Sequence, residues 1–309
     1  MPASGQVLVR VDLSRIRANV RRIADEVGVP IIAVVKADAY GLGAERVAAA
    51  IGDLVDGFCV FRLREAQAAR LWQQTGKPSL ALGLGDGTAE EFKAAGVRPA
   101  VWDVQRAAAL RAARPVLAVD TGMQRFCCPP EEIDAVLKAG GCEEAFTHAT
   151  TLAGVELLVE RAGGRGLRLH AAGSSLLHEP AARLDAVRPG IALYRGAARI
   201  STRLVDVRKS RGPVGYKGFT SAWHGVILCG YANGLRLGPC LVNGRRSRLL
   251  EVGMQSSYVE TAEGDRVGDE VVLLGDSLSE ADVATAWKTS EHEALTTLCA
   301  SGLREWQDL

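Results

Sequence analysis

The chain has 309 residues, a length that suits one large barrel together with a smaller module, so we expect two domains. Hydrophobic residues make up 48% of the sequence and charged residues 24%, and the formal net charge is +1. This composition excludes the strongly basic surface typical of nucleic-acid-binding proteins and the polar bias of a disordered chain, and it indicates no charged partner.

The first predicted element is a strand at residues 6–11, within QVLVRVDL. It is followed by SRIRANVRRIADEVG, whose apolar residues recur at helical spacing and whose first residue, Ser14, is a typical helix N-cap. We expect strand 6–11 to pair with β-structure encoded much later in the chain.

From Pro30 to about Tyr194, short apolar or β-branched runs alternate with longer segments of helical period, and this alternation predicts βα units and a parallel sheet. The predicted strands lie at residues 31–36, 57–61, 79–83, 99–103, 116–120, 145–148 and 167–171, with a short eighth strand near 186–190. Because eight strands is the number in a TIM barrel, we predict an α/β fold with an N-terminal (β/α)8 barrel over residues 12–198.

The texture changes after about Ala198. Strand-like runs are then separated by Gly, Pro and Asn, and helical period returns only in SEADVATAWKTSEHEALTTL near the end. This pattern predicts a smaller, mostly β C-terminal domain over residues 199–309, completed by strand 6–11.

The seven cysteines are odd in number, scattered and without CxxC spacing. We therefore expect buried free thiols rather than a disulfide scaffold or a zinc site, although the adjacent Cys127 and Cys128 leave a redox role open. The five histidines form no cluster with ligand spacing, so no metal is expected. The sequence has neither an apolar run of membrane-spanning length nor the sections of a signal peptide, and we expect a cytoplasmic protein.

A lysine stands at the tip of the first predicted barrel strand. Lys36 follows the buried run PIIAVV and precedes ADAYGLG. Barrel enzymes carry their catalytic groups at the carboxyl ends of the strands, which places Lys36 where chemistry occurs. On position alone, a solvated charge at a strand end is the commoner explanation, so the surrounding sequence has to decide.

The segment AVVKADAYGLG resembles the pyridoxal-phosphate lysine signature of the alanine racemase family, AVVKANAYGHG. Other segments resemble further motifs of that family, in the same order along the chain. They are LAVDTGMQR (117–125), HAAGSS (170–175), VRPGIALYRG (187–196), VGYKGFTSA (214–222), GYANGLR (230–236), VGMQ (252–255) and HEALTTL (292–298). Because the matches stay in register across nearly the whole chain, the chain is identified as a member of this family.

The resemblance implies a pyridoxal-phosphate-dependent isomerase, most simply an alanine racemase of D-alanine biosynthesis. Lys36 would carry the cofactor and act as the base on one face of the substrate, while Tyr231 from the other subunit of a homodimer acts on the opposite face. His148 and Arg188 would assist Tyr231, because a phenol with a pKa near 10 is a weak base at neutral pH. Arg188 would also donate to the pyridine nitrogen, which then stays an acceptor because a guanidinium remains protonated.

The same resemblance implies the binding contacts. The cofactor phosphate would bind the residues Tyr40, Ser174, Gly190, Ile191 and His292. Ser174 could also serve as a helix cap, and the two uses are compatible. The substrate carboxylate would bind Arg125 and the main-chain amide of Met254. The expected partners are an amino-acid substrate and a second copy of the chain, with neither nucleic acid nor membrane.

Several positions depart from the family motifs. Ala118 stands where the family commonly has a lysine, modified to a carbamate, that holds the carboxylate-binding arginine; His292 replaces a tyrosine at the site entrance. The remaining departures are Gln255 and Asn233 for aspartates and Gly173 for an asparagine. Two alternatives therefore stay open: a racemase for another amino acid, such as serine or a basic residue, and a pyridoxal-phosphate-binding paralogue with little turnover.

Overall fold

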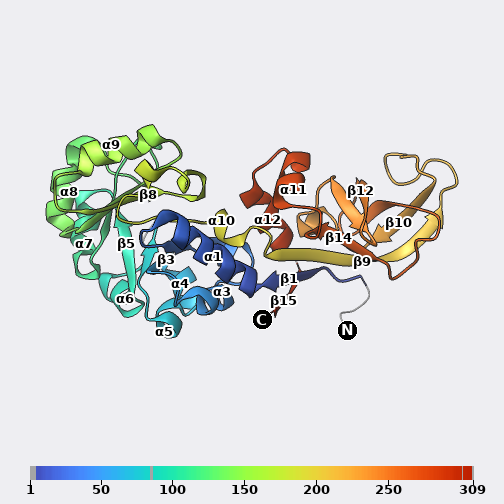
Figure 1. The fold of residues 1–309 in the computed structure, drawn as a ribbon, viewed down its shortest axis with the longest axis horizontal. Coiled ribbons are helices and arrows are strands. Elements are labelled where there is room, and N and C mark those ends of the chain that lie inside the picture. Colours follow the sequence, from blue (N-terminus) through green and yellow to red (C-terminus); the bar gives the residue numbers. More distant parts are fainter. Residues whose placement is uncertain (1–4, 84–85, 301, 308–309) are drawn as a thin grey trace. The chain divides into compact units, whose positions relative to one another are not determined.

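The structure, a computed structural model, describes residues 5–83, 86–300 and 302–307 and divides into two compact units (Figure 1). The barrel unit comprises Ile16–Ala39 and Gly43–Leu193. The β unit comprises Met1–Arg15, Tyr40–Leu42 and Tyr194–Leu309. The short segment Tyr40–Leu42 thus belongs to the β unit although barrel residues flank it on both sides in the sequence. Residues 308–309, with which the predicted second domain ends, lie outside the described residues.

Parallel strands form the centre of the barrel unit, in chain order, which confirms the predicted fold class. They are β2 (Ile32–Val34), β3 (Gly57–Val60), β4 (Ser79–Ala81), β5 (Val97–Val101), β6 (Val116–Ala118), β7 (Glu144–Ala149) and β8 (Arg168–Ala172). The predicted eighth strand is shorter than expected: only isolated parallel bridges, His170 with Ala186 and Ile31 with Val187, close the sheet there. Pro189 has no N–H to continue a ladder, but its carbonyl still accepts the N–H of Val34 at 2.9 Å.

Helices cover the outside of the barrel strands (Figure 1). They are α1 (Leu13–Val27), α3 (Ala44–Ile51), α4 (Leu63–Ala68), α5 (Leu71–Thr75), α6 (Ala89–Ala94), α7 (Val104–Ala109), α8 (Ile133–Gly140) and α9 (Leu152–Ala162). The short α10 (Ile191–Tyr194) follows the last bridges of the barrel sheet. The predicted cap of α1 is wrong. The helix begins at Leu13, and Oδ1 of Asp12 accepts the N–H of Arg15 at 2.8 Å, so Asp12 takes the capping role expected of Ser14.

The β unit contains an antiparallel barrel. Its strands are β9 (Ala198–Lys209), β10 (Trp223–Ile227), β11 (Pro239–Val242), β12 (Arg245–Val252), β13 (Ser257–Thr261) and β14 (Glu270–Leu274). The long strand β9 pairs through its first part with β14 and through its last part with β10, which closes the ring β10-β13-β12-β11-β14-β9. Two helices, α11 (Glu280–Trp287) and α12 (Glu291–Cys299), follow where helical period returns in the sequence.

Strands from the two ends of the chain extend this sheet. β1 (Leu8–Asp12) pairs antiparallel with β9 and parallel with β15 (Leu303–Gln307). The expectation that the first strand joins β-structure encoded much later is therefore confirmed. Because β1 lies between two neighbours, both of its edges are hydrogen-bonded, whereas β15 forms the end of the sheet.

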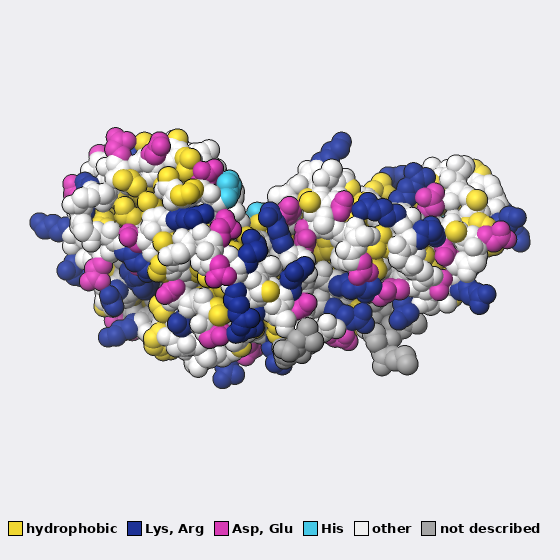
Figure 2. Space-filling view, in the orientation of Figure 1, with side chains coloured by type: hydrophobic (Ala, Val, Ile, Leu, Met, Phe, Trp, Pro, Cys, Tyr) yellow, Lys and Arg dark blue, Asp and Glu magenta, His cyan; other side chains and the backbone are white. Residues whose placement is uncertain are grey.

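The charged side chains on the surface agree with the near-neutral composition. Figure 2 shows Lys and Arg side chains interspersed with Asp and Glu on the visible face of each unit.

Cys127 is partly exposed and the other cysteines are buried, all as free thiols within the described ranges. In those same ranges, no helix is long and apolar enough to cross a membrane and no group of three His, Cys, Asp or Glu side chains is placed to hold a metal ion.

Candidate active site

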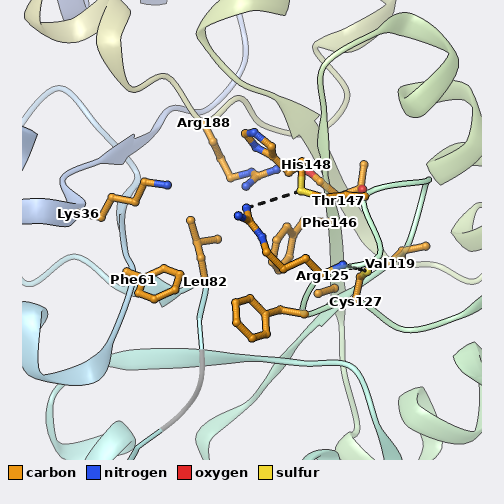
Figure 3. A pocket seen from close by; sticks show the side chains of 13 residues that line it. Lys36, Phe61, Leu82, Val119, Arg125, Cys127, Phe146, Thr147, His148 and Arg188 are labelled. Atoms are coloured by element: carbon orange, nitrogen blue, oxygen red, sulfur yellow. Dashed lines mark hydrogen bonds between the residues drawn. The ribbon is translucent and has the colours of Figure 1, made fainter. Parts of the chain in front are cut away.

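A pocket lies in the barrel unit at the carboxyl ends of the strands, where barrel enzymes carry out their chemistry (Figure 3). It brings together four of the predicted site residues, which come from widely separated parts of the sequence. They are Lys36, Arg125, His148 and Arg188. Apolar side chains complete the wall, among them Phe61, Leu82 and Phe146. The pocket therefore combines several positive groups with an apolar lining.

Lys36 is held by an unusual backbone turn. Strand β2 ends at Val34, two residues before the predicted strand end, and Lys36 opens α2 (Lys36–Tyr40), in which residues 37–39 have φ between 53° and 55°. Left-handed geometry costs about 1–2 kcal/mol per residue and is tolerated best by Gly, Asn and Asp. Asp38 offsets part of this cost, because its Oδ1 accepts the N–H of Ala44 at the start of α3 at 2.8 Å.

The surroundings of Lys36 favour its neutral form. Burial lowers the pKa of its ammonium below the usual value, and the guanidinium groups of Arg125 and Arg188 lower it further. The Cys59 thiol and Glu65 oppose this shift. A lysine with a lowered pKa has more unprotonated amine at neutral pH, which is the form that attacks a carbonyl or accepts a proton.

Arg188 is buried, with 5% of its surface exposed, and is fixed by the barrel itself. Its Nη2 donates to the carbonyl oxygens of Thr147 on β7 and Ala171 on β8, and its guanidinium lies 4.8 Å from the ring centre of Phe146. Its Nε is also buried but has no hydrogen-bond partner among the described residues. A buried donor of this kind normally has an acceptor, so Nε is available to one that enters the pocket.

The inner face of β7 carries a column of functional side chains, because alternate residues of a strand point to the same side. Glu144 and Phe146 share this side, whereas the strand is irregular between Phe146 and Ala149; His148, the one residue of β7 singled out from the sequence, lines the pocket. Glu144 accepts a hydrogen bond from Nε2 of the fully buried His170 at 2.8 Å, and the His170 ring stacks on Phe146 with 5.5 Å between ring centres.

Burial and the contacts of the two side chains together set the charges of this buried pair. Burial would raise the pKa of Glu144, but the hydrogen bond from His170 and the guanidinium of Arg98 lower it to about 2. Burial lowers the pKa of His170 to about 4, although Glu144 opposes that shift. The pair is therefore a carboxylate and a neutral imidazole near neutral pH.

Arg125 projects into the pocket from the loop that follows β6 (Figure 3). Asp120 organises this loop, because its Oδ1 accepts the N–H groups of Gly122 at 2.9 Å and Gln124 at 3.1 Å. Nη2 of Arg125 lies 3.6 Å from the sulfur of Met123, a weak acceptor. Ala118 lines the same pocket and, as a methyl group, offers Arg125 no anionic partner. Cys127, considered from the sequence only for redox chemistry, also lines this pocket.

Ser174 accepts hydrogen bonds from two backbone amides at the edge of the barrel. It begins a short 3-10 helix (Ser174–Leu176), and its Oγ accepts the N–H of Gly190 at 2.9 Å and that of Ala192 at 3.2 Å. Ser174 thus caps α10, one of the two uses considered from the sequence. Amides that converge on one oxygen also suit a phosphate oxygen, so the residues present fit an anionic group here.

Ile191 begins α10 in the barrel unit, and the remaining predicted site residues lie in the β unit. The Tyr40 ring is 4.9 Å from the ring of Tyr194 and 5.8 Å from that of His292, measured between centres, which places Tyr40 and His292 together. Tyr231 and Met254 are neighbours through the backbone: Tyr231 N donates to Gly253 O at 2.8 Å and Ala232 N to Met254 O at 3.0 Å.

Both Tyr231 and Met254 expose more than half of their surface, 57% and 61%. Asn233, which replaces a family aspartate, accepts the N–H of Gly230 at 3.1 Å and closes the turn that carries Tyr231. The amide oxygen therefore takes over an acceptor role that a carboxylate could also fill.

Comparisons with known proteins agree with this arrangement. The model of the family "Alanine racemase, N-terminal domain" matches residues 11–198, and that of "Alanine racemase, C-terminal domain" matches residues 197–305. An alanine racemase of Neisseria meningitidis is 30% identical to this chain over 94% of it and 96% of the relative.

Solved structures show the same fold. The biosynthetic alanine racemase from Pseudomonas aeruginosa superposes with a TM-score of 0.84 at 28% identity, covering 98% of this chain and 99% of the other. The alanine racemase from Bartonella henselae with covalently bound pyridoxal phosphate has a TM-score of 0.86 at 24% identity, covering 99% and 100%.

Proposed function

The chain belongs to the alanine racemase family, and from that premise we propose that it is a pyridoxal-phosphate-dependent enzyme that interconverts L-alanine and D-alanine. The observation that carries the proposal is the convergence of Lys36, Arg188 and His148 with Arg125 at the mouth of the barrel (Figure 3). Lys36 lines the same pocket as the buried Arg188, whose Nε has no hydrogen-bond partner among the described residues. This arrangement is not expected around a lysine that is merely a solvated surface charge.

Each part of the cofactor has a matching group in the chain. Bound pyridoxal phosphate would supply an electron sink that makes the α-hydrogen of an amino acid acidic enough to remove. Lys36 Nζ would be the point of covalent attachment. Arg188 Nε, which has no hydrogen-bond partner among the described residues, would donate to the ring nitrogen. The phosphate contacts proposed are Tyr40, Ser174, Gly190, Ile191 and His292.

Lys36 also moves the proton on one face of the substrate. Its lowered pKa leaves more free amine to accept the α-proton at neutral pH and makes the resulting ammonium a better donor for the return step. The buried setting of Arg188 keeps its guanidinium in place by backbone hydrogen bonds, so the donor does not have to reorganise during the reaction.

We assign the opposite face to Tyr231 of a second copy of the chain, in a homodimer with shared active sites. Its exposure in the β unit supports this role, because a phenol presented on the surface is available to a neighbouring subunit. His148 and Arg188 would lower the energy of its phenolate. A cytoplasmic location, which the scattered cysteines favour, belongs to the same proposal.

Arg125 and the amide of Met254 are the proposed contacts of the substrate carboxylate. With Ala118 beside it, Arg125 has a thioether as its side-chain neighbour rather than a carboxylate or carbamate. This observation favours a second candidate, a racemase whose preferred substrate is an amino acid other than alanine. Without an anionic neighbour, the guanidinium of Arg125 would be oriented differently toward the substrate carboxylate.

Exchange of the α-hydrogen in heavy water tests the proposal. L-Alanine incubated with the protein and pyridoxal phosphate should exchange its α-hydrogen, as followed by NMR, and yield D-alanine. Lys36→Ala should lose both reactions and the mass gain that borohydride reduction fixes on Lys36, whereas Lys93→Ala, an exposed lysine of the same unit, should lose neither.

A panel of amino acids in the same assay separates the two candidates. Faster exchange of serine or a basic amino acid than of alanine favours the second candidate. Unchanged attachment and inversion in Lys36→Ala would overturn both.

A further inference from the structure

The C-terminal strand β15 contacts the segment Tyr40–Leu42, which begins four residues after Lys36 in the sequence. Both belong to the β unit. The indole Nε1 of Trp306 donates to the carbonyl oxygen of Leu42 at 2.7 Å, and Nη1 of Arg304 donates to that of Gly41 at 3.3 Å. Two consecutive carbonyl groups are thus bound by side chains from the last described strand.

These two hydrogen bonds go to backbone carbonyl groups that lie outside regular secondary structure. Tyr40 has φ 60° and Gly41 has φ 84°, so the segment continues the left-handed course that starts after Lys36. Carbonyl groups in such a turn lie outside any helix or sheet ladder and need other donors when they are covered by protein. Trp306 is well suited because its indole N–H can only donate.

Packing fixes the same segment from a second side. A Cβ added at Gly41 would lie 2.6 Å from Cβ of Cys299, at the end of α12, so the backbone of Gly41 touches this helix. The Tyr40 ring, only 6% exposed, packs against Tyr194 and lies near His292. The orientation of the Tyr40 phenol therefore depends on how firmly residues 40–42 are held.

The strand that supplies the two donors is itself set by pairing. β15 runs parallel to β1, with Trp306 opposite Val11. Because alternate residues of a strand share a face, Arg304 and Trp306 point to the same side, and both are less exposed than Leu303, Glu305 and Gln307. A one-residue shift of β15 would turn both donors away from the segment.

We propose that Trp306, assisted by Arg304, is a positioning residue that holds Tyr40–Leu42 so that the Tyr40 phenol meets the cofactor phosphate. The inference rests on the proposed function, since Tyr40 is a phosphate contact only in an enzyme of this type. Trp306 acts through the backbone of Leu42 and touches neither substrate nor cofactor.

Comparison of two ligands, one with and one without phosphate, tests this role. Apo-protein is titrated with pyridoxal phosphate and with pyridoxal. Trp306→Phe keeps an aromatic ring and removes the N–H; it should raise the Kd for pyridoxal phosphate about three- to tenfold and leave the Kd for pyridoxal within twofold. The matched control is Trp223→Phe, a partly exposed tryptophan on β10 of the same unit, which should change neither.

Two further measurements keep the outcome decisive. Hydrogen exchange of the amides of residues 40–44 in the apo-protein should quicken at least about fivefold in Trp306→Phe but not in Trp223→Phe, a readout that needs no cofactor. In the double variant Tyr40→Phe/Trp306→Phe, the rise in Kd should equal that of Tyr40→Phe alone, because the two residues act on one contact.

Each outcome decides a different claim. Equal weakening of both ligands, or unchanged exchange at residues 40–44, would refute the positioning role. If the wild-type protein bound no pyridoxal phosphate at all, the proposed function would fail, while faster exchange in Trp306→Phe would still show that Trp306 holds the segment.

Discussion

Replacing Glu144 with glutamine should lower the stability of the barrel unit at neutral pH and flatten its response to acid. Glu144 is 5% exposed and faces three basic groups: it accepts a hydrogen bond from His170, another from Arg98, and lies 3.8 Å from Nη1 of Arg168. The shift of its pKa from 4.5 to about 2 corresponds to about 3 kcal/mol, and removal of one partner from a buried ionic cluster costs about 3–5 kcal/mol.

The direction with pH follows from the lowered pKa. A carboxyl whose pKa is lower in the folded state stabilises the fold fully above pH 4.5, and this contribution is lost as the pH falls from 4.5 towards 2. The wild type should therefore lose the contribution of Glu144 over that range, a contribution that Glu144→Gln lacks at every pH. Because the pKa of His170 is lowered, both proteins also lose stability as the pH falls from 6.5 to 4, and their profiles run parallel there. In Glu144→Gln, which lacks the carboxylate that opposes this shift, the loss from His170 continues below pH 4.

Thermal unfolding followed by circular dichroism between pH 7 and pH 3 measures this effect. At pH 7, about 3 kcal/mol should appear as a Tm lower by roughly 6–12 °C in a domain of this size. Glu143→Gln is the matched control, because the neighbouring Glu143 is 71% exposed and pairs with the exposed Arg114, so its Tm should hardly change. An equal gap between wild type and Glu144→Gln at pH 7 and at pH 3 would refute the assigned charge state.

Three shorter predictions concern the backbone and the binding groups. Gly41→Ala should lower the Tm more than Gly28→Ala does and weaken pyridoxal phosphate binding, because its Cβ would lie 2.6 Å from that of Cys299. Gly28→Ala, also at positive φ but with nothing within 4 Å, should cost only the backbone strain of about 1–2 kcal/mol. Arg125→Lys should raise the KM for the amino acid about ten- to a hundredfold with a smaller change in kcat, since an ammonium cannot bind a carboxylate through two parallel hydrogen bonds. Ser174→Ala removes the acceptor for two amides and should lower the free energy of unfolding by about 1–2 kcal/mol in the apo-protein, measured by urea titration; no change would mean that water replaces the hydroxyl.

The sequence predicted the fold well wherever a local pattern decided the outcome. Alternation of apolar runs and helical segments gave the order of the barrel strands, and the change of texture after Ala198 marked the β-rich part. The details that failed depend on a choice between near-equivalent neighbours. Asp12 and Ser14 are both good N-caps, and only the point at which β1 ends selects Asp12.

The residues of the candidate site likewise fall into those that a local motif predicted and those that no local pattern indicated. Lys36, Arg125, His148 and Arg188 were found through motifs and lie around one pocket. Glu144 was not found, because in the pair Glu143–Glu144 the sequence does not say which carboxylate points into the barrel. Trp306 was missed for a different reason: its contact with Leu42 joins residues far apart in the chain, and no local pattern predicts such a contact.

The position of β1 between β9 and β15 has a consequence for how the protein is made. During synthesis β1 leaves the ribosome well before its partners, because β9 follows it by about two hundred residues and β15 by about three hundred. The barrel unit, encoded between them, has all its strands available first. The edges of β1 therefore stay unpaired until β9 and β15 have been translated. A nascent chain arrested shortly before Leu303 would contain the whole barrel unit and a sheet that still lacks β15.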